Sequence, residues 1–234
     1  MFYSSQALTI SAIVYRFKTI GGWTLGEMAF LYSVLILSMG LVSSMFSGLI
    51  DFYEFIREGT FDRILLRPLS PLGQIIAGGF EITGVVHLIL GLTAFWIANQ
   101  LQKVDWNWLN IIVFITVILG GSLILASIRI IIASIAFYAV NNSSLVHLFV
   151  FSTREFMLYP MNIYPTGLKF ILTFLLPLGF INYYPAYYFL NKSTEGNLFH
   201  PYLMFGSLPV GIFMVIASLL LWEKGKKAYE SAGS

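Results

Sequence analysis

Hydrophobic residues gather in runs of helix length along this chain, and short polar stretches separate one run from the next. The four clearest runs occupy residues 25–48, 72–99, 109–140 and 203–222. Each has at least about the 20 residues that an α-helix needs to cross the hydrocarbon core of a membrane. Residues 1–17 form a shorter apolar run with no basic region before it. We interpret this run as a shortened first span, or alternatively as a short tilted helix, and not as a signal peptide.

The apolar sequence from residue 145 onward is less regular. Residues 145–158 begin a span, but prolines then interrupt the apolar sequence repeatedly: Pro160, Pro165, Pro177 and Pro185. Apolar pieces of about 10–14 residues fit re-entrant or interfacial helices better than complete spans. The whole pattern predicts an all-α integral membrane protein with about six transmembrane helices and a broken re-entrant helix pair before the last span.

Composition agrees with a membrane protein and removes several classes of function. Hydrophobic residues make up 58% of the 234 residues and charged residues 10%, whereas soluble proteins have about 25% charged residues. A net charge of +2 leaves no basic surface of the kind that binds nucleic acid. The chain has no cysteine and no phosphate-binding, zinc-protease or serine-hydrolase motif. We therefore expect no catalytic residue, metal ligand or bound cofactor on this chain.

Residues 51–71 are the most charged stretch of the chain and lie between two predicted spans. The acidic residues recur at intervals of three and four, which places them on one face of a helix: Asp51, Glu54, Glu58 and Asp62. The basic residues lie on the other sides of that helix: Arg57, Arg63 and Arg67. Pro68 and Pro71 end it, because proline lacks the N–H that a helix needs. Such a helix is suited to docking a water-soluble partner; the alternative is a solvated loop whose charges keep it out of the lipid.

Small residues form stripes along two of the predicted spans. They are Ser33, Gly40, Ser44 and Ser47 in the first of these, and Gly73, Ala77, Gly84, Gly91, Ala94 and Ala98 in the second. Such stripes let membrane helices approach closely. Glu81 and His87 belong to the second stripe by their spacing, so we expect both to face protein, where ionisable groups in a membrane normally lie. The alternative places Glu81 at the membrane interface and leaves His87 neutral and hydrogen-bonded.

Two arginines are expected within the membrane. Arg129 lies on a small-residue face of residues 109–140 and is expected to reach towards the far interface. Arg154 lies near the bilayer centre, where an isolated arginine costs at least about 2.5–3.5 kcal/mol. Glu155 is about 100° away around the helix and is a poor partner, so Glu81 is the most plausible partner of Arg154 within the chain. Alternatively, Arg154 faces a transport pathway, with Glu155 beside it, and contacts polar or anionic cargo.

The distribution of Lys and Arg favours one orientation in the membrane. Six of the thirteen lie in residues 51–71 and in the C-terminal tail, and four lie in segments on the other side. Basic residues are enriched in cytoplasmic segments of membrane proteins. Residues 51–71 and the C-terminus are therefore predicted to be cytoplasmic.

Four stretches of the chain resemble a bacterial family of ABC-2-type transporter permeases. They are residues 21–27, 57–71, 175–186 and 228–234, and the resemblance extends from about residue 21 to the end. Family members usually begin with a cytoplasmic amphipathic helix and a complete first span. This chain lacks the amphipathic helix and part of the first span. Residues 1–234 are expected to form a single permease domain with a shortened first span.

The resemblance implies a six-span permease in the bacterial cell membrane with a cytoplasmic C-terminus. Such a permease pairs with a second permease, identical or paralogous, and with two copies of a cytoplasmic ABC ATPase that binds ATP and Mg²⁺. The stretch after the second span would contain a coupling helix that docks on the ATPase, and its seven charged residues are the implied coupling residues. The broken helix pair would cap a pathway lined mainly by the second and fifth spans.

The first hypothesis is therefore that the chain is the membrane subunit of an ATP-driven exporter and does not itself hydrolyse ATP. The alternative is a proton-coupled secondary transporter that uses Glu81, His87 or Glu155 as its proton carrier. Secondary transporters often contain inverted repeats with paired broken helices. This chain has one broken region, which favours the exporter, and no catalytic constellation supports an intramembrane enzyme.

Overall fold

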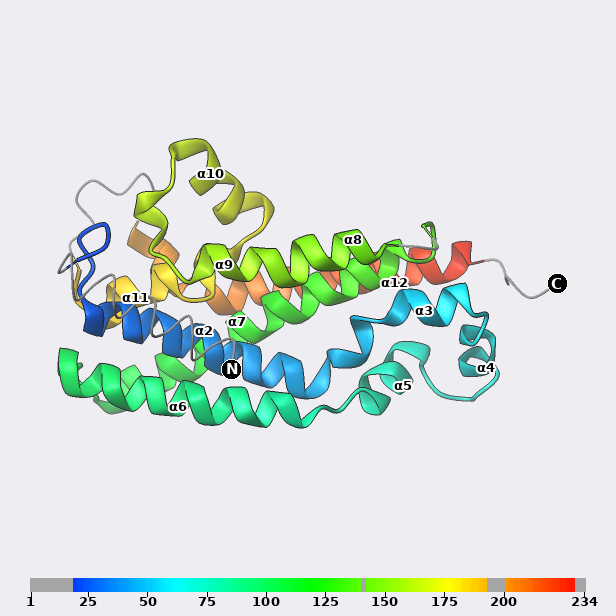
Figure 1. Ribbon diagram of the computed structural model, residues 1–234, viewed down its shortest axis with the longest axis horizontal. Coiled ribbons are helices and arrows are strands. Elements are labelled where there is room, and N and C mark those ends of the chain that lie inside the picture. Colours follow the sequence, from blue (N-terminus) through cyan, green and yellow to red (C-terminus); the bar gives the residue numbers. More distant parts are fainter. Residues whose placement is uncertain (1–18, 140–141, 193–200, 230–234) are drawn as a thin grey trace.

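The computed structural model describes residues 19–139, 142–192 and 201–229. Within these residues, all regular structure is helical apart from one isolated bridge between Ile20 and Trp23. The long helices lie side by side along the longest axis of the molecule (Figure 1). The predicted all-α fold is confirmed.

In the described part of the chain, four helices are long and apolar enough to cross a membrane: α2 (Leu25–Met45), α6 (Ile82–Gln102), α7 (Trp108–Ile135) and α12 (Ser207–Ala228). A fifth candidate is the pair Thr166–Leu175 and Leu178–Phe189, which bends by 76° at a short break. The described residues therefore form a multi-pass membrane protein with four or five candidate spans, and the predicted count of about six is not confirmed. The shortened first span predicted over residues 1–17 lies outside the described residues.

Shorter helices connect these spans. Between α2 and α6 lie η1 (Ser47–Leu49), α3 (Phe52–Arg57), α4 (Phe61–Leu65) and α5 (Pro71–Gly78). After α7 come α8 (Ser143–Val146), the π-helical turn η2 (His147–Ser152) and α9 (Thr153–Met157), without a break between them. The bent region contains η3 (Met161–Ile163), α10 (Thr166–Phe170), the π-helical turn η4 (Ile171–Leu175), η5 (Leu178–Phe180) and α11 (Tyr183–Phe189). The turn η6 (Pro201–Phe205) precedes α12.

Helix α2 is the centre of the bundle, and α6, α7 and α11 contact it. In its most apolar window of 18 residues, 83% of the residues are buried, against 22% in the corresponding windows of α6 and α12. A helix that is apolar all round belongs in an interior, whereas α6 and α12 present apolar surface outward. Helix α2 corresponds to the second predicted span, and its implied role in lining a pathway between two permeases stays a prediction.

Small residues allow α2 and α6 to pack closely, as their spacing predicts. Gly84 of α6 lies against Ser44 and the backbone of Gly40 on α2, and a side chain at position 84 would collide with both. Helix α2 also meets α7, where the Ser122 hydroxyl donates to the Ser38 carbonyl at 3.2 Å. The predicted stripes around Gly40 and Gly84 are thus the faces through which these two helices pack.

The prediction of one span over residues 72–99 is wrong, because the helix is broken between α5 and α6. Hydrogen bonds to the end of α2 hold the break: the Ser47 hydroxyl donates to the Gly79 carbonyl, and the Glu81 N–H donates to the Ser44 carbonyl at 3.2 Å. These bonds satisfy backbone groups that the interrupted helix leaves free. Glu81 consequently lies exposed at the N-cap of α6 and, contrary to prediction, does not face protein within this chain.

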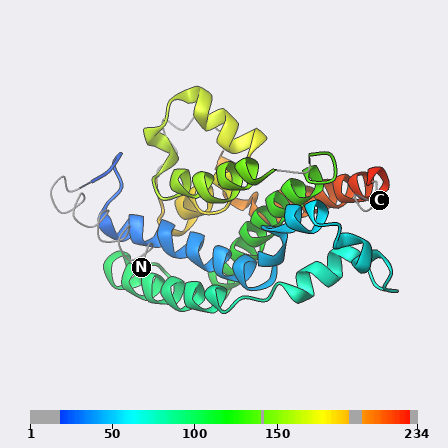
Figure 2. The ribbon, with the colours of Figure 1, turned by 45° about the vertical axis from the view of Figure 1, so that its right-hand side comes forward.

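The bundle has two ends that differ in structure (Figures 1 and 2). We call one the α4 end; it comprises α3, α4, α5 and the C-terminal part of α12. We call the other the Trp23 end; it comprises the start of α2, the C-terminal part of α6, and α11. The long helices run from one end to the other, so a displacement at either end can be transmitted along them.

Candidate functional site

The charged stretch at the α4 end folds into two short helices and not into the predicted single helix. Helix α3 ends at Arg57, and Gly59 has φ +65°, a left-handed conformation that glycine adopts readily and that a continuing helix does not contain. Glu54 and Glu58 belong to α3 and its C-cap, whereas Asp62 belongs to α4. The prediction of one continuous acidic face is therefore wrong.

Aromatic rings, all buried except the partly buried ring of Tyr229, fix both short helices to the bundle. We call this group the aromatic anchor; it consists of Phe52, Phe61, Phe137, Trp222 and Tyr229. Phe52 of α3 packs on Trp222 of α12 with 5.0 Å between ring centroids. Phe61 of α4 packs on Phe137, just after α7, at 5.4 Å. Aromatic pairs at such distances attract each other beyond the effect of buried area, so the anchor joins α3 and α4 to α7 and α12.

Contacts within the chain engage most of the acidic groups of this segment. The Arg57 guanidinium lies 3.9 Å from the Glu54 carboxylate and 3.7 Å from the Glu58 carboxylate. The Tyr229 hydroxyl donates to the Asp62 carboxylate at 3.1 Å. Three of the four acidic side chains predicted to dock a partner therefore already have a partner in the same chain.

The basic residues after Gly59 are arranged differently. Arg63 and Arg67 are exposed, and neither forms an ion pair with any other described residue. Both border a hollow of about 560 Å³ between α4 and α5, which Phe55 and Glu58 also line. The α4 end thus offers a concave surface bordered by two guanidinium groups that form no ion pair with a described residue.

Arg129 is buried in α7 and binds the end of α2. One guanidinium nitrogen donates to the Val42 carbonyl at 3.1 Å, and another donates to the Ser43 hydroxyl at 3.3 Å. Positive charge is favourable beside the last turn of a helix, where the carbonyl groups carry partial negative charge. The expectation that Arg129 reaches to the membrane interface is therefore wrong.

Arg154 pairs with its neighbour in sequence, contrary to prediction. Its guanidinium lies 3.6 Å from the Glu155 carboxylate, because both side chains have enough rotatable bonds to bend towards each other. The predicted pair with Glu81 is not among the ion pairs of the described residues.

Burial, with smaller contributions from Tyr159 and Glu155, raises the pKa of the Tyr164 phenol to about 12, so this phenol stays protonated at neutral pH.

His87 is buried in α6 and faces protein, as predicted. The charges of Arg154 and Arg129 both act on His87. Inside the bundle, His87 therefore lies in electrostatic range of two arginines, Arg154 of α9 and Arg129 of α7. No group of three or more His, Asp or Glu side chains in the described part of the chain is arranged to hold a metal ion.

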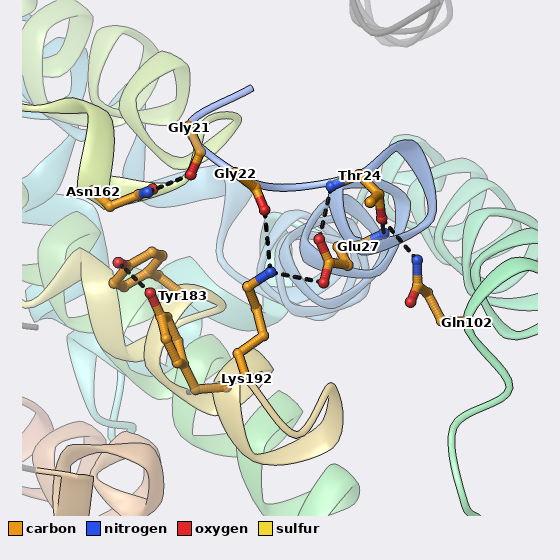
Figure 3. Close-up of polar contacts among 9 residues, drawn as sticks. Gly21, Gly22, Thr24, Glu27, Gln102, Asn162, Tyr183 and Lys192 are labelled. Carbon is orange, nitrogen blue, oxygen red and sulfur yellow. Dashed lines mark hydrogen bonds and ion pairs between the residues drawn. The ribbon is translucent and has the colours of Figure 1, made fainter. Parts of the chain in front are cut away.

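An ion pair at the Trp23 end connects the start of α2 to the residues after α11 (Figure 3). The Lys192 ammonium donates to the Glu27 carboxylate at 2.7 Å, and these side chains are only 18% and 12% exposed. The same ammonium lies 4.5 Å from the centre of the Trp23 ring and 3.4 Å from the Gly22 carbonyl oxygen. Both the carboxylate and the aromatic face therefore stabilise the lysine charge.

Helix-end structure positions both partners of this ion pair. Thr24 and Glu27 form a capping box at the start of α2, in which the Thr24 N–H donates to the Glu27 carboxylate at 2.7 Å. After α11, Asn191 has φ +47°, and the N–H groups of Asn191 and Lys192 donate to carbonyls in the last turn of the helix. This arrangement is a Schellman motif, and it directs Lys192 towards Glu27.

Two further hydrogen bonds join neighbouring segments to the same place (Figure 3). The Gln102 amide at the end of α6 donates to the Thr24 hydroxyl at 2.9 Å. The Asn162 amide in η3 donates to the Gly21 carbonyl at 2.5 Å. Segments that are far apart in the sequence, α2, α6, η3 and the end of α11, are thus linked by polar contacts at the Trp23 end.

Comparison with known families gives the identity of the chain. The sequence profile of a family described as ABC-2 family transporter protein matches residues 1–233. The chain belongs to the ABC-2 transporter family. The resemblance inferred from four short stretches is therefore confirmed, and the protein is a multi-pass membrane permease. No curated protein and no solved structure matched the chain.

In this ABC-2 permease, the residues singled out in the sequence separate by location. The seven charged candidates for coupling all lie at the α4 end: Asp51, Glu54, Arg57, Glu58, Asp62, Arg63 and Arg67. Of the other four, Arg154 pairs with Glu155, His87 lies buried in α6, and Glu81 lies exposed at the N-cap of α6. The functional roles of these residues stay predictions.

Sequence reasoning missed the two structures that hold the ends of the ABC-2 permease together. The spacing of Thr24 and Glu27 is a capping-box pattern that predicts the start of a helix. No local pattern connects Glu27 with Lys192, which lies 165 residues later. The aromatic anchor likewise joins residues from three distant segments, and aromatic residues are too common in this sequence to single them out.

Proposed function

We propose that this ABC-2 permease is the transmembrane subunit of an ABC exporter. It forms a translocation pathway with a second permease, identical or paralogous. Two copies of a separate cytoplasmic ATPase, which binds ATP and Mg²⁺, drive the transport. The α4 end and the C-terminus face the cytoplasm of a bacterial cell, and the Trp23 end faces the outside.

The observation that carries the proposal is the aromatic anchor. Helices α3 and α4 lie beyond the end of α2 (Figure 1), yet they pack on α7 and α12 through buried rings. Close-packed interiors transmit displacement because they have little free volume. A partner that displaces α3 or α4 therefore also displaces two membrane helices, as a permease driven by a separate ATPase requires.

Basic residues support the proposed orientation. In the described residues, the α4 end carries six of them: Arg57, Arg63, Arg67, Lys224, Lys226 and Lys227. The Trp23 end carries Lys103, after α6, and Lys192, after α11. An excess of Lys and Arg marks the cytoplasmic side of membrane proteins.

The proton-coupled alternative has no support from the family of the chain. Glu81 lies exposed at a helix break, and Glu155 is about half exposed in its ion pair with Arg154. Carboxylates that carry protons through a membrane are normally enclosed in the bundle. Neither carboxylate has that environment in this chain.

Copurification with an ATPase tests the proposal. The permease is produced together with each ABC ATPase encoded near its gene or coexpressed with it, and is purified in detergent through a tag on the permease. We expect the ATPase to copurify and the complex to hydrolyse ATP. Failure of every neighbouring or coexpressed ABC ATPase to copurify, together with transport driven by a proton gradient alone, would contradict the proposal.

A matched pair of variants tests the role of the anchor. Phe61 is fully buried in the anchor, whereas Phe80 is 68% exposed at the α5–α6 break. Phe61→Leu is expected to leave the ATPase bound but to change the rate at which the complex hydrolyses ATP, because the ring contacts that link α4 to α7 are lost. Phe80→Leu is expected to leave that rate unchanged.

A further inference from the structure

We propose that the ATPase binds a basic and apolar surface at the α4 end, and that the matching surface of the ATPase is an apolar hollow with an acidic rim. We call this surface the tip; it consists of Arg63, Leu66, Arg67 and Leu69. The inference rests on the proposed function and specifies the chemistry of its partner. It replaces the acidic face that the sequence predicts.

Both leucines of the tip are exposed. Because they lie outside the long apolar helices, contact with lipid around those helices does not account for their exposure. Leu66 is 84% exposed and Leu69 is 67% exposed. They lie between the end of α4 and Ser70, the N-cap of α5. Apolar side chains that are grouped at a surface and bordered by charge are typical of protein–protein contacts.

The turn that carries the tip has a fixed shape. The Gln74 amide donates to the Ile64 carbonyl at 3.0 Å and to the Leu69 carbonyl at 3.1 Å. The Gly73 N–H donates to the Ser70 hydroxyl at 3.2 Å, which caps α5. The aromatic anchor holds the start of α4. The tip is therefore preorganised, and a preorganised surface loses less conformational freedom when it binds.

The tip itself carries two exposed guanidinium groups, those of Arg63 and Arg67, and no carboxylate. Arg57 and Tyr229 contact the three carboxylates closest in sequence, those of Glu54, Glu58 and Asp62. Arg63 and Arg67 form no ion pair with a described residue. A partner that supplies Asp or Glu gains charge-assisted hydrogen bonds to both guanidinium groups. Charge complementarity therefore favours an acidic partner surface.

The position of the tip favours a protein partner over lipid. The long helices run along the longest axis of the molecule, and α4 lies at the extreme end of that axis (Figure 1). It also lies at the end of the molecule in the turned view (Figure 2). The tip is thus displaced along the direction of the spans, away from the bilayer around them, where a water-soluble partner reaches it first.

Charge reversal distinguishes the basic tip from the acidic residues beside it. One variant carries Arg63→Glu and Arg67→Glu. The matched control carries Glu54→Lys and Glu58→Lys, which reverses the same number of charges in the same segment. In copurification at low salt, we expect the tip variant to lose about tenfold or more of the bound ATPase and the control to stay within about twofold. Size-exclusion elution confirms that each permease remains folded.

A neutral variant covers the case in which charge reversal disturbs folding. Leu66→Ser with Leu69→Ser removes the apolar part of the tip without changing its charge, and both positions are exposed. We expect this variant to fold and also to lose about tenfold or more of the bound ATPase. Loss of the ATPase from the acidic control alone, or retention by all three variants, would overturn the inference. No copurification with the unchanged permease would count against the proposed function instead.

A fluorescent probe separates a protein partner from lipid. The natural chain has no cysteine, so Pro68→Cys places a single environment-sensitive label within the tip. In nanodiscs, we expect emission typical of water before the ATPase is added and a shift to shorter wavelength afterwards. Emission typical of an apolar environment in nanodiscs alone, with no change on adding the ATPase, would show that the tip binds lipid and would overturn the inference.

Discussion

The two ends of this ABC-2 permease use charge in opposite ways. At the Trp23 end, Glu27 and Lys192 form a 2.7 Å ion pair that is largely buried and lies beside an aromatic ring. At the α4 end, Arg57 pairs with Glu54 and Glu58 at 3.7–3.9 Å, and these side chains are about half exposed. The first pair connects distant segments, whereas the second pairs join residues of one short helix and its cap.

At the α4 end, the interactions that hold the end together are different from the side chains that are available to bind a partner. At the α4 end, buried aromatic rings supply the cohesion, so charged and apolar groups of the tip remain at the surface, where a partner can reach them. At the Trp23 end, charged groups supply part of the cohesion and are withdrawn from solvent. The comparison teaches that the charged residues of an end are available for docking only where something else holds that end together.

Removing a ring of the aromatic anchor is expected to have the largest effect. Phe61→Ala leaves a cavity beneath α4, and truncation of a buried phenylalanine typically costs about 3–5 kcal/mol. Hydrogen exchange is expected to accelerate in α3, α4 and α5 while the Trp23 end keeps its protection. Phe80→Ala is the control, with an expected change within about 0.5 kcal/mol. Equal acceleration at both ends would contradict the claim that the anchor holds the α4 end specifically.

Breaking the ion pair at the Trp23 end is expected to have the next largest effect. Lys192→Met keeps much of the side-chain volume but leaves Glu27 without its cation, and loss of one partner of a buried pair costs about 3 kcal/mol. Exchange is expected to accelerate in α11 and the first turn of α2. Glu27→Gln in the same chain should recover part of the loss, because the uncompensated charge is gone. Purely additive effects in thermal unfolding of the single and double variants would show that the two side chains are not coupled.

Removing Arg57, the arginine that pairs with two glutamates at the α4 end, is expected to have the smallest effect. Arg57→Ala should lower the free energy of unfolding by less than about 0.5 kcal/mol, since exposed pairs contribute little. Raising the salt concentration from 0.1 to 1 M shortens the screening length from about 10 to about 3 Å and should abolish even this difference. The effect of Lys192→Met should persist at 1 M salt; its disappearance would place the two ion pairs in the same class.

The sequence predicts the long helices well because each is defined by its own composition. The apolar runs at residues 25–48, 109–140 and 203–222 correspond to α2, α7 and α12, with differences of a few residues at the ends. Small-residue spacing also predicts the α2–α6 contact around Gly40 and Gly84. Length, hydropathy and spacing are local properties, so they can be read without the fold.

The errors concern features that distant residues decide. The helix break before Glu81 depends on hydrogen bonds from Ser44 and Ser47. The position of Arg129 depends on the free carbonyl groups at the end of α2. The break of the charged helix at Gly59 is the exception, because glycine within a helical pattern is itself a local signal for a break. Site chemistry that joins separate segments could not be derived from spacing alone.

Photo-crosslinking in cells tests most directly whether the α4 end is the docking end. A photoreactive amino acid is placed at Leu66 in the tip or at Trp108, which is 76% exposed at the start of α7, towards the Trp23 end. With the ATPase coexpressed, we predict a crosslink to the ATPase from position 66 and none from position 108. A crosslink from position 108, or none from either position while the ATPase still copurifies, would contradict the assignment of the α4 end as the ATPase-binding end.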